Sequence, residues 1–475
     1  MKRHKTKKMR RPVAWLLMLI IVFVMSVSGC MQEKSDDEVN NKDDKIVISV
    51  GGYFCDEKLS PELYEYQLDV VRRFEEAYPN VRIVDSKWNF DADTYLSSAE
   101  GNTLPTTYYV PLTEAYTIIN LGYAADITEE FQKRGFYENT RDFMIENISK
   151  GGRIYLIPAS NYDQGLFINM DLYRRVGLVD ADETPYQPKT WDELAIIAKK
   201  MKDETGVAGF VIPTSGRAAG WRFTPIAWSY GTVFEEKVDG KWKAKFDSPE
   251  CAEALQFVKD LKWKYDVLPD MDIDSEKYRE VIARDEAAMG IMEENLAQKV
   301  IDSYGMKRDN IGIVSMPAGP KRRVTLMGGG YRVINKNATS EQIKAAMDWT
   351  EFTGVTVNVN DEFIMNFEEN LNSYKRLGYI IGIEMISPWN DSAETEIYRN
   401  KNNVENLNVN YNHIKLFNDK SSVEIQMEAP VEAQALYDIL GGVVNKVLTD
   451  ENADPSQLLR EAAKEFQEKY LDYLE

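Results

Sequence analysis

Two hydrophobic repeats alternate along residues 45–475. Short apolar runs such as Lys45–Val50 and Val81–Val84 are typical of buried strands. Between such runs lie longer segments in which apolar residues recur every three or four positions, as in an amphipathic helix. Capping residues precede several of these segments: Ser60 before Pro61, Thr190 with Glu193, Ser248 before Pro249, Thr339 with Gln342, and Asp454 before Pro455. This alternation predicts an α/β fold with largely parallel sheets.

The N-terminal segment has a different pattern. Residues 1–11 are rich in lysine and arginine and lack acidic residues, Val13–Met25 is apolar, and small residues lead to Cys30. This order is typical of a secretory signal peptide over residues 1–29, because the apolar run is short for a membrane-spanning helix. The ending Val27–Cys30 resembles a bacterial lipobox, which implies cleavage before Cys30 and its modification with lipid, including a fatty acid such as palmitate. The alternative is an uncleaved anchor helix with an incidental cysteine.

Lipidation at Cys30 predicts a protein held at the extracellular face of the cell membrane, since several acyl chains anchor more firmly than one. Residues 30–44 are polar, charged and without periodicity, as expected of a flexible tether. The sequence leaves open whether the two remaining cysteines, Cys55 and Cys251, form a disulfide.

Charge and composition exclude several classes of function. The chain has 57 Lys and Arg against 77 Asp and Glu, and loss of residues 1–29 would leave 50 against 77, a net charge of −27. Such an acidic chain is a poor partner for nucleic acid. It has only two histidines, His4 and His413, and it lacks a P-loop, an HExxH and a CxxC motif. We therefore expect no cofactor and no metal site, and the absent motifs offer no catalytic residue.

Five segments, in order, carry a resemblance to a known family: Tyr78–Val84; Leu121–Thr128; Gly152–Pro158 with Phe167–Asp171 and Thr190–Leu194; Asp285–Ile291; and Ile311–Pro317 with Gly328–Gly330. They resemble the bacterial extracellular solute-binding proteins of the carbohydrate type (family 1), which include maltose-binding protein. The resemblance covers about residues 45–355. Residues 356–440 show little of it, and Asp361–Asn410 within them look like an elaboration.

The resemblance implies a two-lobed, periplasmic-binding-protein-like fold of type II with a hinge between the lobes. Lobe one would comprise residues 45–157 and 316–354, and lobe two residues 159–312 and 360–475. The chain would cross between lobes at Ile157–Pro158, near Ser315–Met316 and near Val355. The implied function is the solute-binding component of an ABC importer, a monomer that closes on a carbohydrate by hinge motion and delivers it to permease subunits.

Residues that could contact a ligand lie after predicted strands or beside the hinge. Aromatic rings stack on the apolar face of a sugar, and polar side chains bind its hydroxyl groups. The candidates are Tyr53, Phe54, Tyr162, Asp163, Trp221, Glu293, Glu294, Gly329, Gly330 and Tyr331. Each has a plainer interpretation: Trp221 as a core residue, the two glutamates as a solvated loop, and the glycines as a turn. Trp389 is expected to fill a small core of the elaboration.

Two other functions stay open. The protein could bind a non-sugar ligand such as a peptide or polyamine, or serve a sensor kinase. The abundant aromatic residues favour a sugar over a polyamine, while the charge of −27 is compatible with a cationic ligand. A surface polysaccharide hydrolase needs only two suitably spaced carboxylates, which no sequence with 77 acidic residues excludes. The identity of the sugar is beyond the sequence.

Overall fold

The computed structural model describes residues 45–58 and 61–474, except the side chains of residues 62, 294 and 295. The predicted signal peptide, the lipidation site Cys30, the tether and the cap Ser60 lie outside these residues. Within the described ranges, no helix combines the length and the apolarity needed to cross a membrane.

One mixed sheet of eight strands organises the described chain. Its strands are β1 (Ile46–Gly51), β2 (Val81–Asp85), β3 (Thr107–Pro111), β6 (Leu156–Asn169), β9 (Met289–Glu293), β10 (Ile311–Val314), β11 (Val324–Ile334) and β12 (Glu424–Met427). The order is β10-β6-β11-β3-β1-β2, while β9 also pairs with β6 and β12 with β11. Two hairpins stand apart: β4 (Ser149–Lys150) with β5 (Arg153–Ile154), and β7 (Glu235–Val238) with β8 (Lys241–Ala244).

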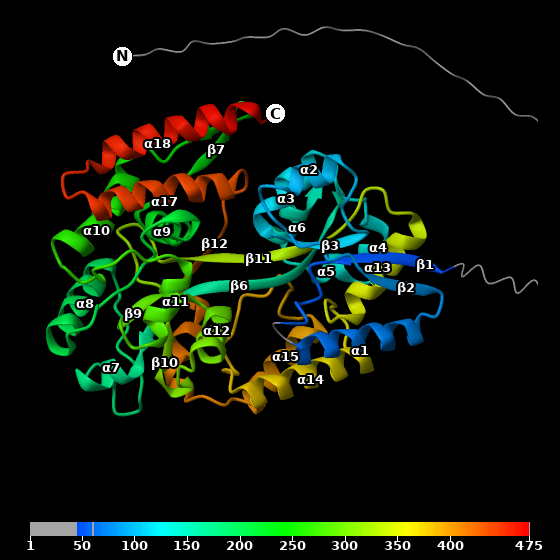
Figure 1. The fold of residues 1–475 in the computed structure, drawn as a ribbon, viewed down its shortest axis with the longest axis horizontal. Coiled ribbons are helices and arrows are strands. Elements are labelled where there is room, and N and C mark those ends of the chain that lie inside the picture. Colours follow the sequence, from blue (N-terminus) through cyan, green and yellow to red (C-terminus); the bar gives the residue numbers. More distant parts are fainter. Residues whose placement is uncertain (1–44, 59–60, 475) are drawn as a thin grey trace, which may run out of the picture. The chain divides into compact units, whose positions relative to one another are not determined.

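Strand directions correct the expected parallel sheets. Among the named strands, parallel pairing is confined to β1 with β2, β1 with β3, and β11 with β12. The two longest strands, β6 and β11, run antiparallel to each other, and β11 is also antiparallel to β3. Figure 1 shows β6 and β11 running side by side from the helices around α9 to the strands β1–β3.

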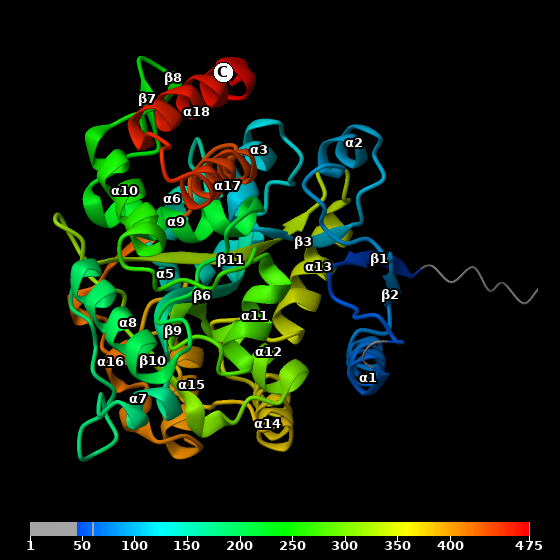
Figure 2. The same ribbon diagram turned by 60° about the vertical axis from the view of Figure 1, so that its left-hand side comes forward.

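Helices cover the sheet on both faces. They are α1 (Pro61–Ala77), α2 (Tyr95–Glu100), α3 (Ala115–Asn120), α4 (Thr128–Lys133), α5 (Phe136–Asn139), α6 (Asp142–Ile148), α7 (Met170–Arg175), α8 (Trp191–Thr205), α9 (Gly216–Tyr230), α10 (Pro249–Trp263), α11 (Ser275–Ala283), α12 (Glu294–Tyr304), α13 (Ser340–Phe352), α14 (Asp361–Leu377), α15 (Glu394–Glu405), α16 (Lys415–Asn418), α17 (Ala433–Thr449) and α18 (Pro455–Lys469). Figure 2 shows α9 and α17 on one side of β6 and β11, and α11 and α12 on the other.

The predicted helix caps form with one difference. The Thr339 hydroxyl accepts a hydrogen bond from the Gln342 amide (3.2 Å), and the Gln342 side chain accepts one from the Thr339 amide (3.0 Å). The Thr190 hydroxyl likewise accepts from the Glu193 amide (3.2 Å). The Glu193 carboxylate, however, accepts from the Lys189 amide (2.5 Å), so the second bond of that capping box forms one residue earlier than expected.

Buried apolar residues form three clusters. The β1–β3 core includes Ile48, Phe74, Val110 and Trp349. The α9–α17 core includes Phe223 and Leu440, together with Cys251, a free thiol that is fully buried. The α11–α12 core includes Val281 and Val300. Strand β6 contributes residues to all three clusters, and β11 contributes to the β1–β3 core and the α9–α17 core.

The chain moves from core to core several times. Leu156 and Ile157 belong to the β1–β3 core and Leu166 to the α9–α17 core, so β6 carries the first crossing. The second lies within β11, between Leu326 and Met327, later than the expected Ser315–Met316. It comes later because Met316 and Val324 still pack in the α9–α17 core.

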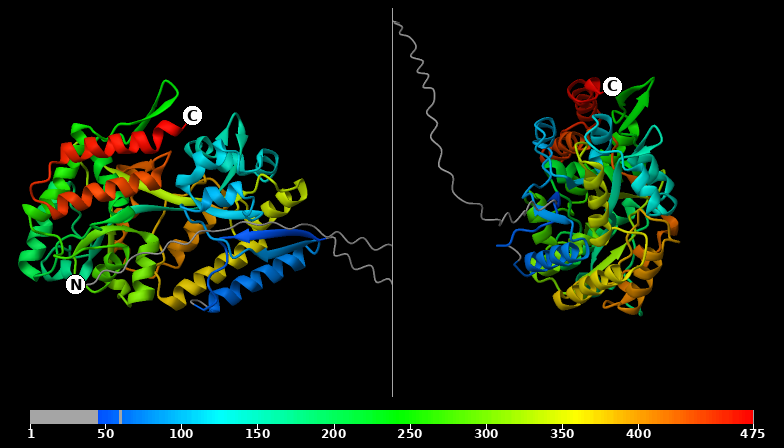
Figure 3. Two further views of the ribbon diagram at one scale, coloured as in Figure 1. Left: turned by 45° about the horizontal axis from the view of Figure 1, so that its top comes forward. Right: turned by 90° about the vertical axis from the view of Figure 1, so that its right-hand side faces the viewer.

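Residues 356–423 pack against more than one core. Their helix α14 lies alongside α1 (Figure 3), where the Arg73 guanidinium donates to Glu362 at 2.6 Å. Trp389 packs in the β1–β3 core with its ring 5.4 Å from that of Phe136, which corrects the expectation that it fills a core of the elaboration alone. Ile380 and Phe417 pack in the α11–α12 core. The elaboration thus ties the cores together.

Candidate ligand-binding site

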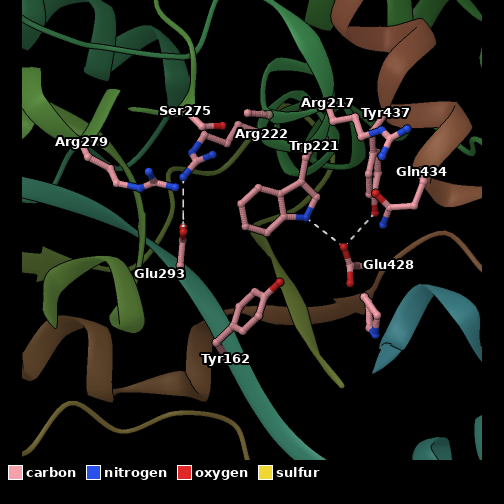
Figure 4. Close-up of a pocket in the computed structure, with 12 residues that line it drawn as sticks. Tyr162, Arg217, Trp221, Arg222, Ser275, Arg279, Glu293, Glu428, Gln434 and Tyr437 are labelled. Carbon is pink, nitrogen blue, oxygen red and sulfur yellow. Dashed lines mark hydrogen bonds and ion pairs between the residues drawn. The ribbon is translucent and has the colours of Figure 1, made fainter. Parts of the chain in front are cut away.

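A cavity of about 350 Å³ opens beside β6, where α9, α11 and α17 approach the ends of β3, β9 and β12 (Figure 4). Strand ends and helix termini deliver mainly polar and aromatic side chains to it. The lining residues are Pro111, Tyr162, Arg217, Ala218, Trp221, Arg222, Ser275, Arg279, Glu293, Glu428, Gln434 and Tyr437. Pro111 ends β3, so both the β1–β3 side and the α9–α17 side contribute to the cavity.

Two aromatic rings meet at a corner of this cavity. The Tyr162 and Trp221 ring centroids are 6.1 Å apart, and the ring planes are inclined by 81°. Trp221 lies in the first half of α9, and Tyr162 projects from β6. Figure 4 shows the two side chains close to each other, and both rings line the cavity, so an occupant would meet their apolar carbon atoms.

Glu428 follows β12 and lies next to the aromatic corner. Its Oε1 accepts hydrogen bonds from the Trp221 indole Nε1 (3.0 Å) and from the Tyr437 hydroxyl (3.1 Å). Burial raises the pKa of Glu428 to about 7, although these two hydrogen bonds lower it.

Close packing of α9 on α17 brings Trp221 and Tyr437 to the same carboxylate. A Cβ atom at Gly220 would lie 2.1 Å from the Tyr437 carbonyl oxygen, and one at Gly441 would lie 2.1 Å from the Gly216 carbonyl oxygen. Only glycine at both positions permits this approach of the two backbones. The geometry of the Glu428 end thus depends on residues that do not line the cavity.

Glu293 ends β9 and is paired with an arginine. Arg222 Nη2 lies 3.3 Å from Glu293 Oε2, and Arg222 Nε donates to the Ile291 carbonyl oxygen at 3.4 Å. The guanidinium also lies over the rings of Tyr278 (4.4 Å) and Trp221 (5.0 Å). Both side chains of the ion pair are largely buried, so the pair fixes this wall of the cavity.

A second cavity of about 120 Å³ shares Glu428 with the first. Glu235, at the start of β7, also lines it and is 9% exposed. Its Oε1 accepts from the Val431 amide (2.9 Å), whereas its Oε2 accepts no hydrogen bond from the described residues. Burial raises the pKa of Glu235 to about 8.

The structure brings three of the predicted contact residues together: Tyr162, Trp221 and Glu293. Glu294 begins α12, and its side chain lies outside the described residues. Tyr53 packs edge-on against Trp349 at 5.0 Å, at the margin of the β1–β3 core. Phe54 lines a separate cavity of about 310 Å³ beside Trp88.

Asp163, Gly329 and Gly330 lie within the long strands β6 and β11. Asp163 follows Tyr162 on β6 and points to the opposite face, where it is 1% exposed and paired with Lys420 at 2.7 Å. A Cβ atom at Gly329 would lie 2.0 Å from the Ser160 carbonyl oxygen, and one at Gly330 would lie 2.2 Å from the Tyr109 ring. Gly329 therefore allows β11 to approach β6 closely and Gly330 allows it to approach β3, and neither glycine lines the main cavity.

Tyr331 is fully buried, and its hydroxyl donates to Met144 Sδ at 3.4 Å. Like every residue of β11 it is buried, and it does not line the main cavity.

Sequence reasoning missed Arg217, Arg222, Arg279, Glu428, Gln434 and Tyr437. Ligand sites in α/β sheets lie beyond the carboxyl ends of strands, and this rule, which identified Glu293, applies equally to Glu428. Glu293 is the last residue of β9, and Glu428 directly follows β12. Within the part of the chain that the structure describes, no group of three or more His, Cys, Asp or Glu residues is placed to hold a metal ion.

Comparison with known proteins gives a consistent result. The family described as bacterial extracellular solute-binding protein matches residues 59–353. Among solved structures, the fold is similar to maltose-bound MalE3 of T. maritima, with 21% identity over 89% of this chain and 99% of that chain and a TM-score of 0.64. It is also similar to UgpB from Mycobacterium tuberculosis in complex with glycerophosphocholine, with 15% identity over 89% and 97% of the two chains and a TM-score of 0.64.

A third similar structure is an ABC substrate-binding protein from Listeria monocytogenes in complex with cycloalternan. It shares 15% identity over 90% of this chain and 99% of that chain, with a TM-score of 0.64. These similarities confirm the predicted two-lobed α/β fold of type II.

Proposed function

Because this chain belongs to the bacterial extracellular solute-binding proteins, we propose that it captures an oligosaccharide in the cavity at Trp221 on behalf of an ABC importer. One observation carries the proposal: the right-angled rings of Trp221 and Tyr162 stand beside carboxylates and guanidinium groups in one cavity. A sugar has an apolar C–H face for such rings and a rim of hydroxyl groups for such polar side chains.

In this proposal, the β1–β3 core belongs to lobe one, the α9–α17 and α11–α12 cores belong to lobe two, and β6 and β11 form the hinge. Two contacts across the cavity mouth support closure as the binding motion. Arg217 on α9 lies 3.3 Å from Asp93, and Gln434 on α17 donates to the Thr113 hydroxyl at 3.1 Å. A ligand that contacts both sides would favour this closed arrangement.

The remaining parts of the proposal concern partners and location. Lipid on Cys30 anchors the protein at the extracellular face of the membrane, and the tether of residues 30–44 leaves the folded part free to reach the permease subunits. The protein acts as a monomer and releases its ligand chemically unchanged.

Thermal unfolding of the purified full-length protein with a panel of neutral and amino oligosaccharides, peptides and polyamines tests the proposal. A ligand at 100 times its Kd should stabilise the protein by about 2.7 kcal/mol, a rise in Tm of about 3 °C or more. We expect a saccharide to produce this rise and to be recovered intact, and Trp221→Ala to abolish it. A rise with peptides or polyamines alone would overturn the proposed ligand class, and shortened saccharides would overturn the non-catalytic role.

A further inference from the structure

The charges that line the main cavity are unequally compensated. Every arginine there has a carboxylate partner: Arg222 with Glu293 (3.3 Å), Arg217 with Asp438 (2.7 Å) and Arg279 with Glu276 (2.6 Å). Glu428, in contrast, has only neutral donors, the Trp221 indole and the Tyr437 hydroxyl. Its Oε2 accepts no hydrogen bond from the described residues, and Figure 4 shows that oxygen turned away from both donors.

A second carboxyl group continues the same feature. Glu235 and Glu428 both line the smaller cavity, and Glu235 is only 9% exposed. Its only described hydrogen-bond donor is the Val431 amide, and its Oε2 is unpartnered. The wall between the two cavities therefore presents two carboxyl groups with spare oxygen atoms and no basic side chain bonded to either.

Such a wall suits a cation better than a neutral hydroxyl group. A carboxylate that is removed from water without an opposite charge is costly, and a cation at hydrogen-bond distance offsets that cost. A hydroxyl group supplies a hydrogen bond but leaves the charge uncompensated. Burial raises the pKa of Glu428 to about 7, so an adjacent cation would also complete the ionisation of this side chain.

The indole of Trp221 determines where on the ligand the cation should lie. Its Nε1 is 3.0 Å from Glu428 Oε1, so the carboxylate sits at the edge of the indole ring rather than over its face. A sugar ring that stacks on the face directs its rim substituents toward that edge. Resting on the proposed function, we infer that the captured saccharide carries a protonated amine, which binds Glu428 between the two cavities.

Three β-1,4-linked trimers test the inference because they differ only at one substituent of each ring. The glucose trimer has a hydroxyl group there, the N-acetylglucosamine trimer a neutral amide, and the glucosamine trimer an amine. Isothermal titration of the purified full-length protein at pH 6.5 should give at least about 10-fold tighter binding of the glucosamine trimer than of either neutral trimer.

Two variants locate the effect. Glu428→Gln keeps an oxygen for the Trp221 and Tyr437 donors but loses the charge, so it should lose about 10-fold in affinity for the glucosamine trimer and change less than about 3-fold for a neutral trimer. Glu461→Gln removes the same charge from the exposed face of α18 and should leave all affinities unchanged. The unliganded Tm of each variant reports whether it is folded.

The outcomes separate the inference from the proposed function. Equal or tighter binding of the neutral trimers overturns the inference and leaves saccharide capture intact. Equal losses in Glu428→Gln for charged and neutral trimers also overturn it, because the residue then acts by hydrogen bonding alone. Failure of every saccharide, neutral or amino, in the full panel overturns the proposed function and the inference with it.

Discussion

Glu293 and Glu428 occupy equivalent positions at opposite ends of one cavity, yet their neighbours differ. Each lies at the carboxyl end of a strand, β9 or β12. Glu293 is paired with Arg222, whereas Glu428 accepts hydrogen bonds only from Trp221 and Tyr437. The strand end thus determines where a carboxylate lies, and the residues packed around it determine whether it fixes the wall or remains open to a ligand.

The paired end should depend most on its arginine. Arg222→Met leaves Glu293 largely buried without a cation, so we expect a loss of about 3–5 kcal/mol in the free energy of unfolding, measured by urea denaturation. Arg279→Met is the control, because its partner Glu276 is exposed and the loss there should stay below about 1 kcal/mol. Similar losses in both variants would show that the Arg222–Glu293 pair is not the reason for the effect.

Glu235, which lines the smaller cavity together with Glu428, should make the stability of the protein depend on pH. Burial raises the pKa of Glu235 in the folded protein to about 8 from an ordinary value of 4.5, so its bound proton stabilises the fold fully below pH 4.5 and this contribution is lost as the pH rises to 8. Glu235→Gln stays neutral and should gain roughly 2–4 kcal/mol over the original protein at pH 8, but nothing at pH 4.5. Exposed Glu236→Gln is the control. Urea denaturation at both pH values decides, and a gain that is independent of pH would contradict the assignment.

The close contact between α9 and α17 at the Glu428 end should make stability sensitive to a single added methyl group. An alanine methyl group at Gly441 would meet the Gly216 carbonyl oxygen at 2.1 Å, which should cost about 1–3 kcal/mol of stability and separate Trp221 from Tyr437. The neighbouring Gly442 is exposed with nothing within 4 Å of the added methyl group, so Gly442→Ala should stabilise α17 by about 0.5–1 kcal/mol. Thermal unfolding of the pair measures the contrast, and two stabilised variants would refute it.

The smallest expected effect is the loss of one hydrogen bond to Glu428. Tyr437→Phe removes a donor that lowers the pKa of Glu428, so this pKa should rise above its present value of about 7, while the protein loses about 1 kcal/mol of stability. Carbon-13 NMR of labelled glutamate carboxyl groups follows the titration directly. An unchanged pKa would show that the Tyr437 hydroxyl does not contribute to the pKa of Glu428.

The sequence was informative where one local signal decides the outcome. The N-caps at Thr190 and Thr339 depend on neighbours in the chain, and both form at the predicted residue. Trp221 and Tyr162, two of the predicted contact residues, line the main cavity. Strand direction was harder, because an apolar run looks the same whether its partner runs parallel or antiparallel.

The missed residues depend on contacts between distant parts of the chain. Glu428 meets Trp221 across a separation of 207 positions, and no spacing rule connects them. The strand before Glu428 is short and partly exposed, so its apolar signal is weak. At Tyr331 the local signal was misleading. Its glycine-rich neighbours suggested a turn, whereas β11 is a strand that is buried along its whole length.

The repeated passage of the chain between cores has a consequence for how such a protein can evolve. Because β6, β11 and residues 356–423 each join different cores, neither side of the cavity is encoded by one continuous stretch. Exchange of a gene segment that includes β6 or β11 with that of a relative would replace parts of more than one core at once and mismatch them. A substitution at Glu428 or Trp221, in contrast, changes one residue of the cavity lining and leaves the path of the chain between the cores as it is. Changes of specificity are therefore expected to accumulate one residue at a time rather than by recombination of modules.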